Sequence, residues 1–223
     1  MERSAVLQAF LDRGEHVVGI KTGFSPEAVQ QYPGAGGHVW GWLTDAMSVE
    51  PGTICELRTE IKVKAEAEIA FALKEDLIGP DVTELDVLAA TAAICPAIEL
   101  PVTDSPWVTS DMGEIIAHNA AASRFVVGRP RFDFQRLDLN LLGAVLEVNG
   151  EIVASGTGAA ILGGPAGAIA RLANALSETG QGLRSGYIIL TGGLTQAVPI
   201  HSGSTVEANF AHLGSVGIHV VHG

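Results

Sequence analysis

Positive charge is scarce in this sequence. Its 223 residues include 13 Lys and Arg against 25 Asp and Glu, which gives a formal net charge of −12 at neutral pH. Nucleic acids and anionic membranes are bound through clustered Lys and Arg side chains, so this balance argues against both as main partners. An anionic small molecule would have to be bound locally, by a metal ion or by one well-placed cation.

Cysteine and long apolar runs are scarce as well. Neither Cys55 nor Cys95 has a nearby Cys or His at the spacing of a metal site, and two reduced thiols are typical of a cytoplasmic protein. No apolar run reaches the roughly 18–20 residues that span a bilayer. Residues 1–4 do not open a signal peptide. We therefore expect a cytoplasmic protein.

Segments with a helical pattern are few, and strand patterns are many. Helices are predicted at residues 1–13, 81–94 and 165–178. Strands are predicted at residues 16–21, 60–73, 142–148, 151–155, 187–191, 197–199, 204–210 and 215–221, with Asn149-Gly150 as a hairpin turn. Loops are expected at residues 22–37, with one helical turn at 26–31, and at 101–124, and residues 96–100 form a short apolar segment. This pattern favours one β-rich α+β domain over residues 1–223.

The alternating segment E-A-E-I-A-F at residues 66–71 carries two acidic side chains. On a strand, side chains two residues apart point to the same face, about 6.5–7 Å apart. Glu66 and Glu68 therefore share one face, while Ile69 and Phe71 point to the other. Charged strand residues usually face water, so a solvated face is the alternative to a binding site.

Two features favour a metal site over that alternative. Ala65 and Ala67 leave room beside the carboxylates, and a third acid, Glu99, ends the apolar stretch 92–98. An ionised carboxylate in such surroundings must be paired or bound to a metal, or else be neutral. Three oxygen ligands without His or Cys suit a hard cation such as Mg²⁺ or Mn²⁺.

These acids lie within a longer series of motifs that covers most of the chain. The motifs are G-I-K-T-G (19–23), G-W-L-T-D-A-M (41–47), E-A-E-I-A-F-A-L (66–73), K-E-D-L-I-G-P (74–80), C-P-A-I-E-L (95–100), A-H-N-A-A-A-S-R-F-V-V-G (117–128), N-G-E-I-V-A-S-G-T-G-A-A-I-L-G-G-P (149–165), I-L-T-G-G-L-T (189–195) and L-G-S-V (213–216). Together they resemble the fumarylacetoacetase-like superfamily. More closely, they resemble its branch of 4-oxalocrotonate decarboxylases and 2-hydroxypentadienoate hydratases. The resemblance implies a mixed β-sheet roll with a few helices.

The resemblance also implies a ligand set. In that family the two glutamates of E-x-E and the glutamate of P-A-I-E bind Mg²⁺ or Mn²⁺, and they correspond here to Glu66, Glu68 and Glu99. This assignment agrees with the oxygen-only set inferred from the residues themselves.

Four further residues match family positions in or near the active site. The resemblance implies catalytic roles for Lys21 and Asp45, and substrate contacts for Ser155 and Thr191. Without the resemblance, Lys21 would be interpreted as a solvated lysine and Asp45 as a turn or cap residue. A Ser or Thr before Gly is also common in plain turns.

The sequence departs from the family pattern at several places. His118 stands where an Asp is usual, Gly164 where a His usually precedes the Pro, and Pro106 where an Arg often follows the Ser. The segment ahead of Lys21 is also shorter than usual. The predicted metal ligands are all present, so these departures concern the substrate contacts.

The implied substrate is a small 2-oxo or 2-hydroxy-enoate that chelates the cation through its carboxylate and 2-oxygen. The cation then stabilises negative charge on the 2-oxygen. A decarboxylase would convert 2-oxo-3-hexenedioate (4-oxalocrotonate) to 2-hydroxypenta-2,4-dienoate, and a hydratase would add water to that product. G-W-L-T-D-A-M and L-T-G-G-L-T favour the decarboxylase. A hydratase and a non-catalytic metal-binding partner subunit remain as alternatives. A homo-oligomer, and a complex with the sister enzyme, are expected.

Overall fold

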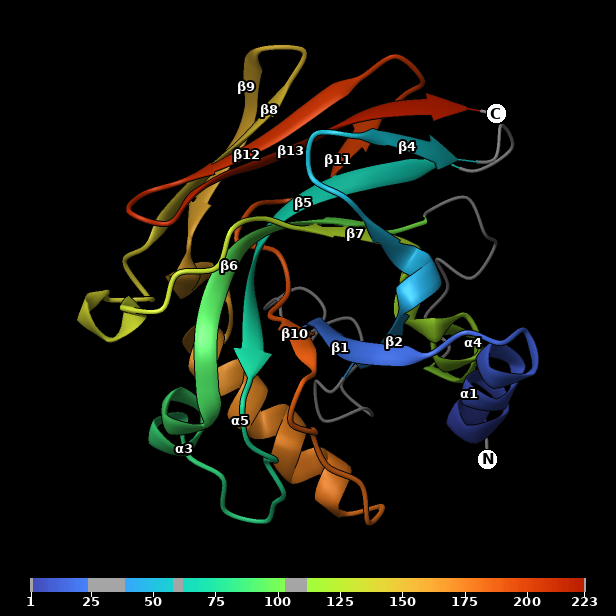
Figure 1. The fold of residues 1–223 in the computed structure, drawn as a ribbon, viewed down its shortest axis with the longest axis vertical. Coiled ribbons are helices and arrows are strands. Elements are labelled where there is room, and N and C mark those ends of the chain that lie inside the picture. The colour runs from blue at the N-terminus through green and yellow to red at the C-terminus, as the bar shows by residue number, and fades with distance from the viewer. Residues whose placement is uncertain (1, 24–38, 58–61, 103–111, 223) are drawn as a thin grey trace.

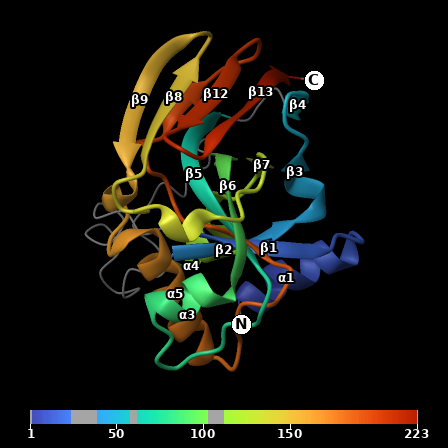
Figure 2. The same cartoon turned by 60° about the vertical axis from the view of Figure 1, so that its left-hand side comes forward.

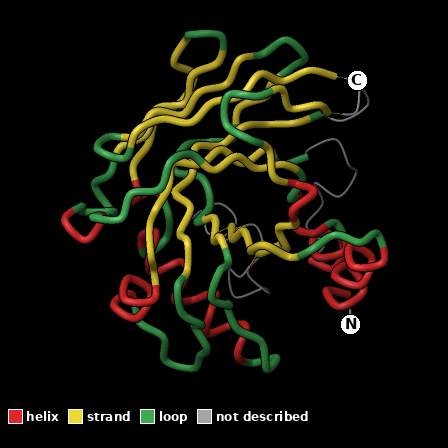
Figure 3. Tube along the Cα trace, in the orientation of Figure 1, coloured by secondary structure: helices red, strands yellow, loops and turns green. Residues whose placement is uncertain are grey.

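The computed structural model describes residues 2–23, 39–57, 62–102 and 112–222. Strands form two sheets, and the few helices lie at their periphery (Figures 1 and 3). The helices are α1 (Glu2–Asp12), α3 (Glu84–Ala90), α4 (Met112–Ala117) and α5 (Gly164–Ser177), with short 3₁₀ turns η2 (Asp45–Met47), η3 (Asn119–Ala121), η4 (Phe134–Arg136) and η5 (Gly158–Ala160). None of the helices in the described ranges is both long and apolar enough to cross a bilayer.

The larger sheet carries the centre of the molecule. Its strands follow the order β2-β1-β10-β5-β6-β7-β3, and β11 also pairs with β5. Their bounds are β1 Val17–Gly23, β2 Val39–Thr44, β3 Ser48–Val49, β5 Val63–Leu73, β6 Thr91–Leu100, β7 Arg124–Val127, β10 Ile188–Leu190 and β11 Val198–Ile200. The β1–β10 and β3–β7 pairs are parallel and the others antiparallel, so the sheet is mixed as expected.

The smaller sheet has the order β4-β13-β12-β8-β9. Its strands are β4 Ile54–Leu57, β8 Gly143–Val148, β9 Glu151–Thr157, β12 Thr205–Phe210 and β13 Gly214–His222. Asn149 and Gly150 have φ of +55° and +81°, the left-handed pair that a tight two-residue hairpin requires. The predicted hairpin is therefore confirmed.

The two sheets share one apolar core. The smaller sheet lies over β5, β6 and β7, while α3 and α5 pack together at the other end of β5 and β6 (Figures 1 and 2). Ile69 and Phe71 of β5 are fully buried in this core together with Leu146 of β8 and Val206 of β12. The predicted inward face of β5 is thereby confirmed.

The predicted helix over residues 81–94 is too long at both ends. It begins at Glu84, where the Thr83 and Asp86 side chains form a reciprocal capping box, and it ends at Ala90. Residues 91–94 already belong to β6. This strand is buried on both faces, so its sequence lacks the alternation that would reveal it.

Pro96 lies inside β6, where a proline is unusual because it has no N–H to donate. The regular β6–β7 pairing stops at the Ala97–Val127 pair, so it does not include Pro96. The Pro96 carbonyl accepts from the Gly128 N–H at 2.8 Å. Gly128 has no Cβ that would crowd the proline ring. The residues predicted as a short apolar segment are thus the end of a central strand.

Other predictions have mixed outcomes. The helices at the N-terminus and at α5 are confirmed within a residue or two, as are the strands of the second half. The loop prediction for residues 101–124 is wrong from residue 112 onward, where α4, η3 and the start of β7 lie, because segments this short show no clear period. The predicted helical turn at 26–31 lies outside the described residues.

Candidate metal centre

Three glutamates meet on one face of the larger sheet. Glu66 and Glu68 lie two residues apart on β5, and Glu99 on β6 is the direct cross-strand partner of Glu66. Each of the three offers a carboxylate oxygen within 4.8 Å of the other two. Residues directly opposite in an antiparallel pair have Cβ atoms about 4.5–5.5 Å apart, so the register itself brings these acids together.

Two of the three acids are deeply buried. Glu68 and Glu99 are 0% and 1% exposed, whereas Glu66 is half-buried. Burial, followed by the negative charge of Glu99, raises the pKa of Glu66 to about 7, although Lys21 and Lys64 oppose the shift. Burial and the charges of Glu99 and Glu66 raise the pKa of Glu68 well above its ordinary value. Three acids held this close therefore favour binding a positive charge.

Lys21 supplies one such charge. It lies on β1, beside Leu190 of β10, and its Nζ is 3.1 Å from Oε1 and 3.3 Å from Oε2 of Glu99. Burial by itself lowers the pKa of Lys21, but the charges of Glu99, Glu66 and Glu68 outweigh burial and raise it. The lysine is thus a buried ammonium group and not the solvated lysine of the alternative interpretation.

The residues after β10 also contact the cluster. The Gly192 N–H donates to Oε2 of Glu68 at 2.9 Å. The fully buried Thr191 donates its hydroxyl to the Ile69 carbonyl at 3.1 Å. Thr191 therefore lies beside the residue that contacts Glu68, and its predicted contact with the substrate stays a prediction.

The donor set fits a hard divalent cation. Oε1 of Glu68 is buried and accepts no hydrogen bond from the described residues, whereas Oε1 of Glu99 faces the Lys21 ammonium at 3.1 Å. Buried carboxylate oxygens without a donor are costly unless a cation binds them, and all three side chains offer oxygen only. Glu66, Glu68 and Glu99 are therefore the residues that would hold Mg²⁺ or Mn²⁺.

Two other predicted site residues lie outside this cluster. Ser155 is exposed on β9 of the smaller sheet, and the adjacent Gly156 packs so closely on the Leu194 carbonyl that a Cβ would overlap it. Asp45 is half-exposed, and its carboxylate accepts from the His16 N–H at 2.9 Å and lies 3.1 Å from His16 Nδ1. These contacts make Asp45 a surface partner of His16, and its predicted place near the substrate stays a prediction.

Two of the three departures from the family pattern can be located. Gly164 begins α5 with φ of +75°, and a Cβ there would overlap the Asn140 side chain. A histidine here would have to take a left-handed backbone conformation and displace the Asn140 side chain. His118 directly precedes η3, and Pro106 lies outside the described residues.

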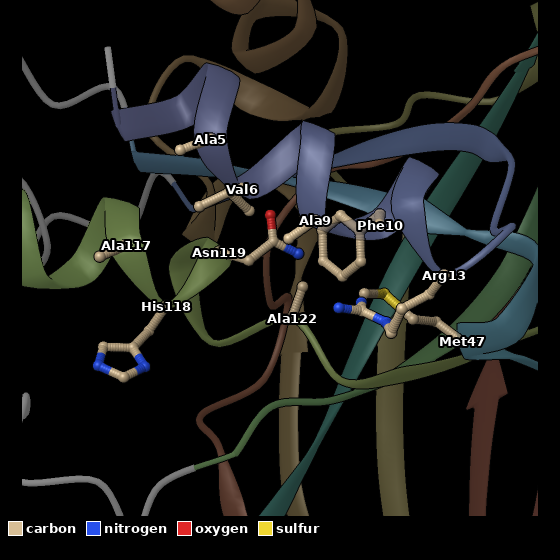
Figure 4. A pocket seen from close by; sticks show the side chains of 10 residues that line it. All are labelled: Ala5, Val6, Ala9, Phe10, Arg13, Met47, Ala117, His118, Asn119 and Ala122. Atoms are coloured by element: carbon tan, nitrogen blue, oxygen red, sulfur yellow. The ribbon is translucent and has the colours of Figure 1, made fainter.

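A cavity of about 540 Å³ lies apart from the glutamates, between α1, η2 and the α4–η3 corner. Phe10, Met47 and Asn119 converge on it, with Arg13 towards one end and His118 towards the other (Figure 4). None of the three carboxylates lines this cavity. It is therefore separate from the candidate metal centre.

Sequence reasoning missed the role of residues 192–195. Thr195 is buried, and its hydroxyl accepts from the Ala67 N–H at 3.1 Å, between the two glutamates of β5. The consecutive glycines after a predicted strand were the available signal, because such pairs often mark a bulge.

Comparison with known proteins places the chain in a family. The model of the Fumarylacetoacetate (FAA) hydrolase C-terminal family matches residues 38–221, so the chain belongs to this family. Within it, the chain is 40% identical over 206 residues to 4-oxalocrotonate decarboxylase of Pseudomonas sp. (strain CF600), covering 92% of this chain and 77% of that protein. It is also 40% identical over 179 residues to 2-hydroxypent-2,4-dienoate hydratase of Pseudomonas putida, covering 78% of this chain and 79% of that protein.

A solved structure agrees with these relatives. That of 4-oxalocrotonate decarboxylase from Pseudomonas putida G7, complexed with magnesium and adipate, matches with a TM-score of 0.92 and 35% identity, over 98% of this chain and 83% of that chain. The family inferred from the motifs and the β-rich α+β fold are both confirmed.

Proposed function

We propose that this chain is a divalent-metal carbon–carbon lyase that decarboxylates 2-oxo-3-hexenedioate to 2-hydroxypenta-2,4-dienoate. The observation that carries the proposal is the buried Lys21 ammonium, ion-paired to Glu99 beside three convergent carboxylates. The similarity to decarboxylases over 92% of the chain supports the choice of substrate. We assign catalysis to a single domain over residues 1–223.

The reaction breaks the bond between C5 and C6 of the substrate. C6 leaves as CO₂, and its electron pair moves through the conjugated chain to the 2-oxygen, which then takes a proton. A divalent cation, Mg²⁺ or Mn²⁺, supplies Lewis-acid stabilisation of the charge on that oxygen.

Lys21 contributes a second positive charge to the site. The three carboxylates that face it raise its pKa in the metal-free protein, and we propose that its ammonium positions the distal carboxylate of the substrate or the proton transfers. Glu99 orients the ammonium by contacting it with both oxygens. Thr191, beside the cluster, and Ser155, on the neighbouring sheet, are proposed to contact the substrate, and Asp45 is proposed as a second catalytic group.

The second candidate function is hydration of 2-hydroxypenta-2,4-dienoate. A hydratase relative is as similar in identity as the decarboxylase relative, although over a shorter stretch. Both reactions need negative charge stabilised on the same 2-oxygen, so the cluster serves either. A non-catalytic metal-binding subunit is the third candidate, and its support is the set of departures from the family pattern at His118, Gly164 and Pro106.

Two assays separate these functions. Purified protein with Mg²⁺ or Mn²⁺ is given 2-oxo-3-hexenedioate while CO₂ release is followed, and is then given 2-hydroxypenta-2,4-dienoate while the loss of dienol absorbance is followed. Rapid CO₂ release is expected. No activity in either assay, with Mn²⁺ binding intact, would instead support the non-catalytic metal-binding subunit.

We also propose that the protein is a cytoplasmic homo-oligomer that can associate with its sister enzyme. The two buried free thiols, Cys55 and Cys95, suit a reducing compartment. Light scattering of the protein, alone and mixed with the sister hydratase, tests the assembly.

A further inference from the structure

The connection between β10 and β11 follows the edge of β5 beside the metal ligands. Regular pairing stops at Leu190 opposite Ala70 and resumes at Val198 opposite Ala65. Residues 191–197 thus lie opposite the shorter stretch 66–69, so this connection bulges away from β5. Bulges interrupt a ladder and re-aim the groups of the bulged strand.

The bulge still satisfies the backbone of β5 on both sides of Glu68. The Leu194 N–H donates to the Ala67 carbonyl at 2.8 Å, and the Thr191 hydroxyl donates to the Ile69 carbonyl at 3.1 Å. The Ala67 N–H has no backbone acceptor in this ladder and donates instead to the Thr195 hydroxyl at 3.1 Å. Ala67 is fully buried and Thr195 is 5% exposed, so water does not readily replace this bond.

The same bulge contacts Glu68 directly and passes close to Glu66. Gly192, with φ of +92°, turns its N–H onto the Glu68 carboxylate. A Cβ at Gly193 would come within 2.6 Å of the Thr195 carbonyl and 3.4 Å of the Glu66 carboxylate, so only glycine fits without a shift. The position of Thr195 therefore decides where the bulge lies against Glu66 and Glu68.

We propose that Thr195 is a positioning residue of the metal centre, whose hydroxyl fixes Ala67 and the bulge so that Glu66 and Glu68 point at one cation. This inference rests on the metal centre of the proposed function. Partners that orient metal ligands without touching the metal typically change metal affinity 10–100-fold when they are removed.

The test compares Mn²⁺ affinity, measured from the electron paramagnetic resonance signal of free Mn²⁺, among four proteins. Thr195→Val keeps the shape and removes the acceptor, and Thr195→Ser keeps the hydroxyl. Thr91→Val is the matched control, because Thr91 is equally buried and its hydroxyl donates to the Val87 carbonyl at 2.7 Å, at the far end of β6. The melting temperature of each metal-free protein is recorded alongside.

We expect Mn²⁺ affinity 10–100-fold lower in Thr195→Val, with Thr195→Ser and Thr91→Val within about threefold of the wild type. Both valine variants should melt at lower temperature, so a general loss of stability cannot account for the difference. Equal Mn²⁺ affinity in Thr195→Val and wild type, or an equal loss in Thr91→Val, would overturn the proposal.

Two further outcomes are also decisive. If Thr195→Val does not fold, Thr195→Ala, which also removes the acceptor, is measured in its place against the same expectations. A wild-type protein that binds no Mn²⁺ would overturn the metal centre itself and this proposal with it, whereas failure of Thr195 alone leaves the metal centre standing.

Discussion

Three close carboxylates should bind a cation and should repel one another when no cation is bound. Replacing Glu68 by Gln should separate these two effects. Glutamine keeps the shape of the side chain and an oxygen that can accept the Gly192 N–H, but it removes one negative charge. We expect the variant to lose metal affinity and metal-dependent turnover while it keeps its fold.

The magnitude follows from the geometry of the cluster. The ligand oxygens lie within 4.8 Å of one another. At that separation two unit charges interact by about 3 kcal/mol in a medium of effective dielectric constant near 20. A cation bound between the carboxylates is at least as close to each of them, so losing one charge should weaken Mn²⁺ binding by roughly 100-fold or more. The same loss relieves repulsion in the metal-free protein, which should unfold no more easily than the wild type.

Two measurements check this prediction. Mn²⁺ affinity is taken from the free-ion resonance signal, and the free energy of unfolding from urea titration in the presence of a chelator. Glu151→Gln, an exposed acid at the start of β9, is the control for a general charge effect. Unchanged Mn²⁺ affinity, or a metal-free variant destabilised by more than about 2 kcal/mol, would refute the reasoning.

The remaining predictions concern protonation, the lysine, a surface acid and a helix cap. The metal-free protein should lose stability as pH rises from about 4.5 to about 7. The pKa of Glu66 is raised to about 7 in the folded state. Between these pH values the folded protein therefore binds more protons than the unfolded chain, so a rise in pH favours unfolding. Urea titration with a chelator at several pH values checks this, and a rise in stability across the window would contradict it. Lys21→Met should abolish CO₂ release yet still bind Mn²⁺, because the lysine is not a metal ligand. Activity and Mn²⁺ binding are measured on the same preparation. Retained turnover would show that Lys21 has no part in the mechanism. Asp45→Asn should keep Mn²⁺ affinity, because its contacts are with His16 at the surface, and a 100-fold loss of turnover at saturating substrate would reveal its predicted catalytic role. Thr83→Ala should lower the free energy of unfolding by about 1 kcal/mol through loss of the capping box, with Mn²⁺ affinity unchanged; an equal stability in urea would mean that the cap contributes nothing.

Local pattern alone determined several features of this protein. The two-residue period of a strand put Glu66 and Glu68 on one face and Ile69 on the other, because strand geometry does not depend on distant residues. Asn149-Gly150 set a hairpin because few residues other than Gly and Asn readily take a positive φ. The family motifs and the oxygen-only donor set predicted Glu66, Glu68 and Glu99 as metal ligands, and the structure brings these three acids together.

Tertiary structure decided the rest. Glu99 lies opposite Glu66 only because β5 and β6 pair in one register, and Lys21 reaches Glu99 only because β10 lies between β1 and β5. Pairing between segments about 30 to 170 residues apart leaves no periodic trace in either segment. The start of β6 was predicted as part of a helix for a different reason. A strand that is buried on both faces has no polar face to show its two-residue period. The contact of Thr195 with Ala67 depends on a bulge, whose place is fixed by the strand beside it and not by its own sequence.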